Sequence, residues 1–141
     1  MRTLLSILLL SGVLLTGMSA KAQAPTPGAI SGTYVCVHDT LTIGITVANG
    51  TVQLRSGRTT VADPSAVDVS SLPNGVDIAA GTVKLTPTGL TFRTAPGGAA
   101  TGLTYNLALN ADGSLTGSLI GHSNGGPVNI TDARFYHQQS K

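Results

Sequence analysis

Residues 41–55, LTIGITVANGTVQLR, decide the fold of this chain. Apolar residues alternate with small or polar ones on both sides of Asn49-Gly50, the dipeptide typical of a two-residue type I′ turn. If these two residues form the turn, Val47 faces Val52 and all the apolar side chains of the stretch lie on one face. The stretch therefore predicts an antiparallel hairpin that turns one face toward a core.

A second hairpin is predicted in the C-terminal half. The alternating run 103–109 leads into Asn110–Gly113, which is typical of a type I turn followed by a G1 bulge, and 114–121 returns as the partner strand. In the last predicted strand, Val128–His137, the apolar positions change from even to odd near Thr131-Asp132. This change of parity predicts a β-bulge there.

The middle of the chain has shorter apolar runs, some of which could be irregular edge segments. Thr86–Gly89 predicts a type II turn that leads into a strand containing Leu90 and Phe92, and His122–Pro127 predicts a Gly-rich loop. About eight strands and no helical periodicity indicate an all-β, antiparallel meander, either a barrel or a sandwich. The short runs are Arg58–Ala62, Ala66–Ser70, Val76–Ala79 and Thr82–Thr86.

The N-terminus has the features of an export signal. Arg2 is followed by the apolar run Leu4–Leu15 and by a small-residue cleavage motif that ends at Ala22. The run is too short and too soon followed by polar residues to predict a membrane span. We therefore expect a cleaved signal helix in 1–22, an extended linker in 23–29, a single antiparallel β domain in 30–138 and a disordered tail in 139–141.

Composition limits the classes of partner and the cell compartments that the sequence allows. The whole chain carries a formal charge of +2, but Arg2 and Lys21 leave with the signal, so the mature domain is formally neutral and has no basic cluster for nucleic acid. Cys36 is the only cysteine, which excludes an intrachain disulfide, and it lies too far beyond Ala22 to carry a lipid anchor. The sequence predicts a periplasmic or secreted protein that is not a lipoprotein and has no membrane span in its mature form.

Residues 121–125, GHSNG, match the G-x-S-x-G pattern of α/β-hydrolases, and Asp132 and His137 follow in the order of a catalytic triad. In those enzymes the serine lies on a strand-to-helix turn, whereas here Gly126-Pro127 and another predicted strand follow. Asp132 and His137 differ by five positions on that strand and so point to opposite faces unless the bulge intervenes. The sequence thus predicts a turn and not an active site, and we expect no enzyme.

A metal site has weak support. Cys36 and His38 are two residues apart on a predicted strand, so both could reach one ion, with His122 or His137 completing the site. Two candidate ligands fall short of a spaced Cys/His framework. A buried thiol beside a strand-end histidine is the simpler explanation of these two residues, so no metal or cofactor is expected.

Two parts of the chain resemble known families. Gly32-Thr33-Tyr34 on the first strand and Arg134 on the last resemble lipocalin and avidin-like barrels, in which a G-x-W motif pairs with a last-strand arginine; tyrosine here replaces the tryptophan. This resemblance implies a closed barrel with Arg134 stacked on Tyr34, whereas in an open sandwich Arg134 is a solvated edge residue. Residues 110–117 resemble the D-G-x-L-T-G hairpin of small exported bacterial β-domains of unknown function, which implies a C-terminal antiparallel sheet and no defined activity.

Our leading hypothesis is an exported, non-enzymatic β-barrel-like protein that binds a small apolar ligand or contacts an envelope protein through its loops. The candidate ligand-pocket or barrel-closing residues are Tyr34, Phe92, Tyr105, Arg134 and Phe135.

The alternative is a structural or adhesive β-sandwich with a filled core that makes protein or surface contacts through Thr-rich outer faces. These faces would include Thr42, Thr46, Thr82, Thr86, Thr91 and Thr104.

Overall fold

A computed structural model of the protein describes residues 30–58, 61–98 and 101–139. The expected signal peptide 1–22, the linker 23–29 and residues 140–141 of the expected tail lie outside these ranges, and they stay predictions.

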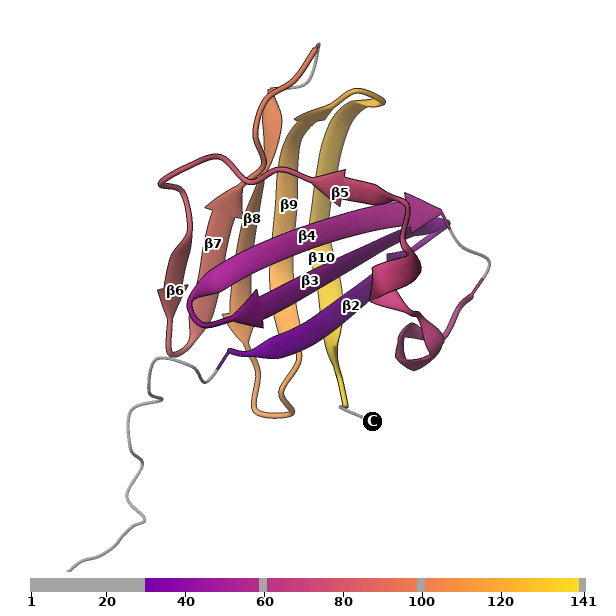
Figure 1. The fold of residues 1–141 in the computed structure, drawn as a ribbon, viewed down its shortest axis with the longest axis vertical. Coiled ribbons are helices and arrows are strands. Elements are labelled where there is room, and N and C mark those ends of the chain that lie inside the picture. The colour runs from indigo at the N-terminus through magenta and orange to yellow at the C-terminus, as the bar shows by residue number, and fades with distance from the viewer. Residues whose placement is uncertain (1–29, 59–60, 99–100, 140–141) are drawn as a thin grey trace, which may run out of the picture.

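Nine antiparallel strands form one sheet in the order β5-β4-β3-β2-β10-β9-β8-β7-β6. The sheet curls into a half-barrel, so that β2, β3 and β4 lie across β7 to β10 (Figure 1). The all-β antiparallel prediction is confirmed, and the described residues contain no α-helix. The strands are β2 (Gly32–His38), β3 (Leu41–Ala48), β4 (Thr51–Arg58), β5 (Asn74–Val76), β6 (Lys84–Thr86), β7 (Gly89–Arg93), β8 (Gly102–Leu109), β9 (Leu115–Ser123) and β10 (Gly126–Gln138).

The β3–β4 hairpin has the predicted turn and register. Asn49 and Gly50 have φ angles of 53° and 77°, the two positive values that a type I′ turn requires. Val47 pairs with Val52 and Ile45 with Leu54. This face of the hairpin packs into the main core, because period-two alternation gathers Ile43, Ile45, Val47 and Leu54 on it.

The β8–β9 turn also follows the prediction. The amide of Gly113 donates to the carbonyl of Asn110 at 3.0 Å, and the amide of Asn110 donates to the carbonyl of Ser114 at 2.8 Å. Gly113 has a φ of 88°, which glycine adopts without strain. Two hydrogen bonds from Ser114 to the Asp112 carboxylate lower the pKa of Asp112 below its usual range and fix the turn.

Strand β10 joins the two halves of the sheet. It pairs with β9 from Gly126 to Phe135 and with β2 from Tyr136 to Gln138, so the first and last described strands are neighbours in the middle of the sheet. The register shifts between Ile130 and Ala133. The bulge predicted from the parity change is therefore confirmed, and it bends the strand where the half-barrel curls.

The segment Ala66–Ser70 is not a strand, contrary to the prediction. It belongs to two short 3₁₀ helices, η1 (Pro64–Ala66) and η2 (Val69–Ser71). Asp63 and Asp68 cap them, with carboxylate oxygens that accept the amides of the serines two residues later at 3.0 and 3.1 Å. These local side-chain bonds outweigh the apolar alternation that suggested a strand.

This 3₁₀ segment covers the outer face of β2, β3 and β4 (Figure 1). Val69 packs so closely on β3 that a Cβ at Gly44 would lie 2.5 Å from its Cγ1 atom. The Arg55 guanidinium on β4 donates to the carbonyl of Leu72 and ties down the end of the segment. A small second core forms outside the half-barrel, and its buried members are Val35, Val67, Val69 and Leu72.

Thr42 on β3 is fully buried on this covered face, and its hydroxyl has no hydrogen-bond partner among the described residues. A buried, unpaired hydroxyl costs stability, so Thr42→Val is expected to raise the free energy of unfolding by about 1 kcal/mol. Urea denaturation measures this change. Thr46→Val is the matched control, because the Thr46 hydroxyl lies 3.4 Å from that of Thr33 and should yield no gain. If Thr42→Val lowers the free energy of unfolding, the Thr42 hydroxyl has a hydrogen-bond partner after all.

Two predicted connections differ in detail. The turn between β6 and β7 lies where expected, but neither Thr88 nor Gly89 has a positive φ, so the predicted type II turn is wrong. Instead the Thr86 hydroxyl accepts the amide of Thr88 at 3.3 Å, a local bond that holds a turn without left-handed backbone. The predicted loop His122–Pro127 is also shorter, because Ser123 pairs with Gly126 and only two residues connect β9 to β10.

The sheet ends at β5 and β6, and the chain between them crosses from one half to the other (Figure 1). Residues 77–79 hydrogen bond to 93–95, with Ala95 donating to Asp77 and Ala79 donating to Arg93, each at 2.8 Å. The main core lies between the two halves. Its buried residues are Ile30, Tyr34, Cys36, Ile43, Ile45, Val47, Leu54, Leu90, Phe92, Tyr105, Leu107, Leu115, Leu119, Ala133 and Phe135.

Candidate functional site

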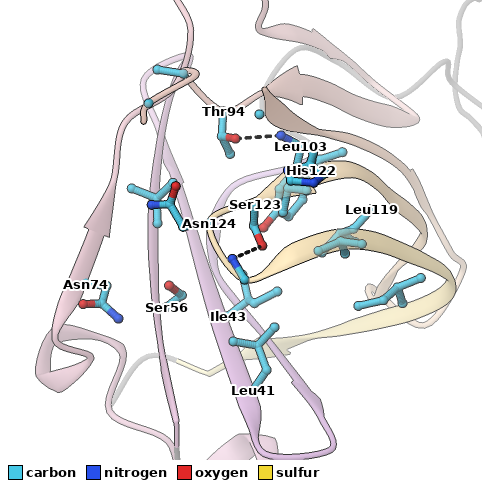
Figure 2. A pocket seen from close by; sticks show the side chains of 18 residues that line it. Leu41, Ile43, Ser56, Asn74, Thr94, Leu103, Leu119, His122, Ser123 and Asn124 are labelled. Carbon is cyan, nitrogen blue, oxygen red and sulfur yellow. Dashed lines mark hydrogen bonds between the residues drawn. The ribbon is translucent and has the colours of Figure 1, made fainter. Parts of the chain in front are cut away.

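An open cavity of about 460 Å³ lies at one end of the half-barrel, between its two halves (Figure 2). Strands β3, β4 and β5 line one side, and β8, β9 and β10 line the other. The labelled lining residues in Figure 2 are Leu41, Ile43, Ser56, Asn74, Thr94, Leu103, Leu119, His122, Ser123 and Asn124.

The cavity exists because small and polar side chains replace large ones in one row of the sheet. Across β2, β3, β4 and β5, the row through Tyr34 continues with three aliphatic residues that pack into the core. The next core-facing row, nearer the open end of the half-barrel, begins with Cys36 and Ile43 but ends with Ser56 and Asn74. These two do not fill the space that large side chains would occupy, so this end of the half-barrel stays open.

The floor of the cavity is apolar. Tyr105, Leu119 and Ile130 stand side by side on β8, β9 and β10, and Ile43 faces the cavity from β3. The Tyr105 ring stacks on that of Phe92 with centroids 4.5 Å apart, so the floor continues directly into the main core. A molecule seated here would bury an apolar surface against this floor.

The rim of the cavity is polar and carries no formal charge. Ser56 and Asn74 lie on one side, and Ser123 and Asn124 lie at the β9–β10 turn (Figure 2). Ser123 is used by the fold, because its hydroxyl accepts the amide of Gly125 at 3.2 Å. None of the described residues that line the cavity is Asp, Glu, Lys or Arg.

His122 is one of the lining residues that sequence reasoning did not propose as a ligand contact. Strand parity places it on the same side as Ile120, which is exposed. The backbone departs from a regular pleat here, with φ angles of 95° at Gly102 and 152° at Gly121, so parity fails. His122 lines the cavity, and its Nδ1 atom is buried without a hydrogen-bond partner among the described residues.

Of the five predicted site residues, only Tyr105 lines this cavity. Tyr34, Phe92 and Phe135 are each at most 1 % exposed and belong to the closed core, so they do not form the expected mouth. Large aromatic side chains bury most apolar area in the interior, and this is where the fold places them. The fifth residue, Arg134, does not line the cavity, and its side chain is partly exposed to solvent.

Burial raises the pKa of Tyr105 above the usual range for tyrosine, with the nearby Cys36 adding to the shift. Free tyrosine ionises near pH ~10. The unfolded chain therefore releases this proton at a pH where the folded chain still holds it, so the stability contribution is complete below about pH 10 and is lost as the pH rises further.

Tyr105→Phe should accordingly make the loss of stability above about pH 10 less steep, by up to about 1.4 kcal/mol per pH unit. Urea midpoints measured across this range test the change. Tyr136→Phe, at a ring that is 47 % exposed, is the control for removing a tyrosine hydroxyl outside the core. An unchanged slope in Tyr105→Phe would show that Tyr105 titrates as a solvated group.

The stacking of Arg134 on Tyr34 that the barrel resemblance implies does not form, and the alternative of a solvated Arg134 and a core Tyr34 is what the structure has. The Arg134 side chain is 44 % exposed, lies over the ring of Tyr136 at 5.9 Å and donates to the Ser114 hydroxyl at 3.0 Å. Tyr34 instead makes an edge contact with the ring of His137, with centroids 4.9 Å apart. Strands β2 and β10 are indeed neighbours, but alternation along β10 turns Arg134 outward.

A double-mutant cycle on Tyr34 and His137 should give a coupling energy of about 0.5–1.5 kcal/mol, because the two rings are in contact. The same cycle on Tyr34 and Arg134 should be additive within about 0.5 kcal/mol. Stability of the single and double variants in urea provides both values. Coupling to Arg134 that exceeds coupling to His137 would restore the barrel-closing pair and contradict the contacts described here.

The triad pattern does not assemble. Ser123 pairs with Gly126 at the start of β10, whereas His137 lies eleven residues further along the same strand and pairs with Tyr34. At about 3.3 Å per residue, roughly 35 Å of strand lies between Gly126 and His137. Ser123 occupies a two-residue turn between strands and not a strand-to-helix turn.

The candidate metal ligands lie in different surroundings. Cys36 lies in the main core, where burial raises the pKa of its thiol, and His122 lies at the cavity. Across the part of the chain that the structure describes, no three His, Cys, Asp or Glu side chains come together as a metal site.

The Thr-rich faces of the adhesive alternative are only partly accessible. Thr42 is buried and Thr46 is half-buried beneath the 3₁₀ segment, whereas Thr86 and Thr104 are exposed. The threonines therefore do not form one continuous outer surface.

Comparison with known proteins gives no relative. No protein-family model matches the chain, and no curated protein or solved structure matches it. Within the described ranges, none of the helices has the length and apolar character to traverse a membrane.

Proposed function

We propose that this protein is an exported, non-enzymatic binding protein that holds a small, mainly apolar molecule in the open end of its half-barrel. The observation that carries the proposal is the cavity of about 460 Å³, with an apolar floor and a polar, uncharged rim. Small-molecule sites typically have volumes of ~300–1,000 Å³, apolar walls and a few polar groups, and this cavity has all three properties.

The packing of the rest of the domain supports this proposal. The main core is closed by residues such as Phe135 and Leu115, neither of which has any exposed surface. The domain thus has the side chains to fill its interior, yet one end is lined by Ser56, Asn74 and Gly102 and remains open. A purely structural sandwich has no need of such an opening, since an unfilled apolar space costs stability.

The predicted export signal completes the proposal. A product that is cleaved after Ala22 and carries no lipid anchor would meet its ligand in the periplasm or outside the cell. The ligand would then be a molecule present in that compartment, and binding would not require a cytoplasmic cofactor.

Native mass spectrometry of the mature protein, purified from its own host, tests the proposal. The wild-type protein should retain a small molecule. Val128→Trp should lose it, because Val128 lines the cavity and the indole would fill it. Asn129→Trp is the matched control: Asn129 is the next residue on β10 and is exposed, so the ligand should be retained.

Circular dichroism must show that both tryptophan variants keep the β fold. Equal retention by Val128→Trp and Asn129→Trp would place the ligand outside the cavity. A bare mass together with higher-order assembly would contradict ligand binding and favour the adhesive alternative.

A further inference from the structure

We infer that the cavity selects an uncharged ligand with an apolar body and one hydrogen-bonding group, such as a hydroxyl or carbonyl, that pairs with His122. This inference rests on the proposed function and specifies the chemical class of the ligand.

The absence of ionic partners within the cavity argues for an uncharged ligand. Of the 18 described residues that line it, none is acidic and none is Lys or Arg. A carboxylate or ammonium group buried here would lose its hydration shell and gain no opposite charge in return. Neutral polar groups do not carry this penalty, because the hydroxyls and amides of the rim can pair with them.

The distribution of the lining residues argues for a ligand with two chemically distinct ends. Leu41 and Ile43 lie in the lower part of the cavity in Figure 2, with Ser56 and Asn74 at the level of Ile43, whereas Thr94 and His122 lie toward its upper part beside Leu103. A ligand whose apolar body packs against Leu41 and Ile43 would therefore place its other end near His122.

His122 is the residue best suited to pair with a hydrogen-bonding group at that end. Its Nδ1 atom is buried and has no partner among the described residues, so the fold does not use this hydrogen-bonding site. A buried polar atom without a partner is costly, and a ligand hydroxyl or carbonyl would remove the cost. Because Nδ1 is shielded from solvent in this rotamer, binding requires the imidazole to rotate until one of its nitrogens, a donor or an acceptor in the neutral ring, faces the ligand.

The size of the cavity indicates which probes fit. A volume of about 460 Å³ corresponds to roughly fifteen water molecules in the liquid. Two fused aromatic rings with one substituent fall within this limit. Naphthalene, 2-naphthol and 2-naphthoate share the same apolar body and differ only in having no polar group, a neutral hydroxyl or a negative charge.

Titration of the mature protein with the three compounds, followed by ligand-observed NMR at about pH 8, tests the inference. At this pH 2-naphthol is neutral and 2-naphthoate is ionised. We expect 2-naphthol to bind about tenfold more tightly than naphthalene, and 2-naphthoate to bind more weakly than both.

His122→Phe keeps a ring of similar size and removes the hydrogen bond. In this variant 2-naphthol should bind only as tightly as naphthalene. His137→Phe is the control, because His137 lies at the far end of β10 and does not line the cavity. This variant should keep the preference for 2-naphthol.

The outcomes separate the inference from the function on which it rests. If 2-naphthoate binds as tightly as 2-naphthol, or if His122→Phe keeps the preference for 2-naphthol, the inference is wrong while small-molecule binding stands. If none of the three compounds binds to the wild-type protein, the proposed function fails and the inference fails with it.

Discussion

Gly117→Ala is expected to lower the free energy of unfolding by about 3 kcal/mol or more. Gly117 lies on β9 where β8 approaches so closely that a Cβ would collide with the carbonyl oxygen of Asn106 and lie 3.1 Å from the Cα of Leu107. Both atoms belong to the backbone, so no side-chain rotation can relieve the contact. The two strands would have to separate and lose ladder hydrogen bonds.

Urea denaturation followed by far-ultraviolet circular dichroism measures this loss. Gly75→Ala is the matched control, because Gly75 also lies on a strand and a Cβ there would meet only the end of the Arg55 side chain at 3.9 Å, an ordinary contact distance. This control should change stability by less than about 1 kcal/mol. If Gly117→Ala unfolds at the same urea concentration as the wild-type protein, β8 and β9 are further apart than described.

Phe135→Ala should cost about 3–5 kcal/mol, the usual result of deleting a fully buried phenylalanine. The Phe135 side chain has no exposed surface and its ring lies 6.4 Å from that of Tyr105. It is also the last residue of β10 that pairs with β9 before the strand passes to β2. The cavity left by the substitution would therefore lie where the two halves of the sheet join.

Tyr136→Ala gives the comparison for this substitution. Tyr136 is the next residue on the same strand, but it is 47 % exposed and its ring contacts only the Arg134 guanidinium among the aromatic and cationic groups described. We expect a loss below about 1 kcal/mol, measured by the same urea transition. Similar losses for the two substitutions would mean that β10 does not present alternate residues to core and solvent.

The features that sequence reasoning predicted correctly are local. Alternation at period two, the Asn49-Gly50 turn and the parity change at Thr131-Asp132 each follow from residues that are close in the chain. The 3₁₀ segment was missed although a local signal existed, since Asp63 and Asp68 are each followed two residues later by a serine that they bind. That repeated pattern favours a capped turn over a strand.

The candidate site was harder to predict because it depends on distant residues. Its aromatic candidates were chosen for their size, but size favours burial in the core, and only Tyr105 reaches the cavity. A better signal was present on β4, where the core-facing residue that follows Leu54 is Ser56 and not a large apolar residue. No rule of alternation could place His122, because two glycines with positive φ break the regular pleat beside it.

The meeting of the first and last strands at the centre of the sheet has a consequence for folding kinetics. Thr33 pairs with Gln138, so a contact that completes the sheet closes a loop of about one hundred residues, and such closures slow folding. A circular permutant that links these ends and opens between β5 and β6 would run through the strands in the order in which they lie side by side. Its contact order would fall while its native contacts stayed the same, so it should fold faster than the natural chain. In the natural chain, β2 cannot complete its pairing until the last strand, β10, is available.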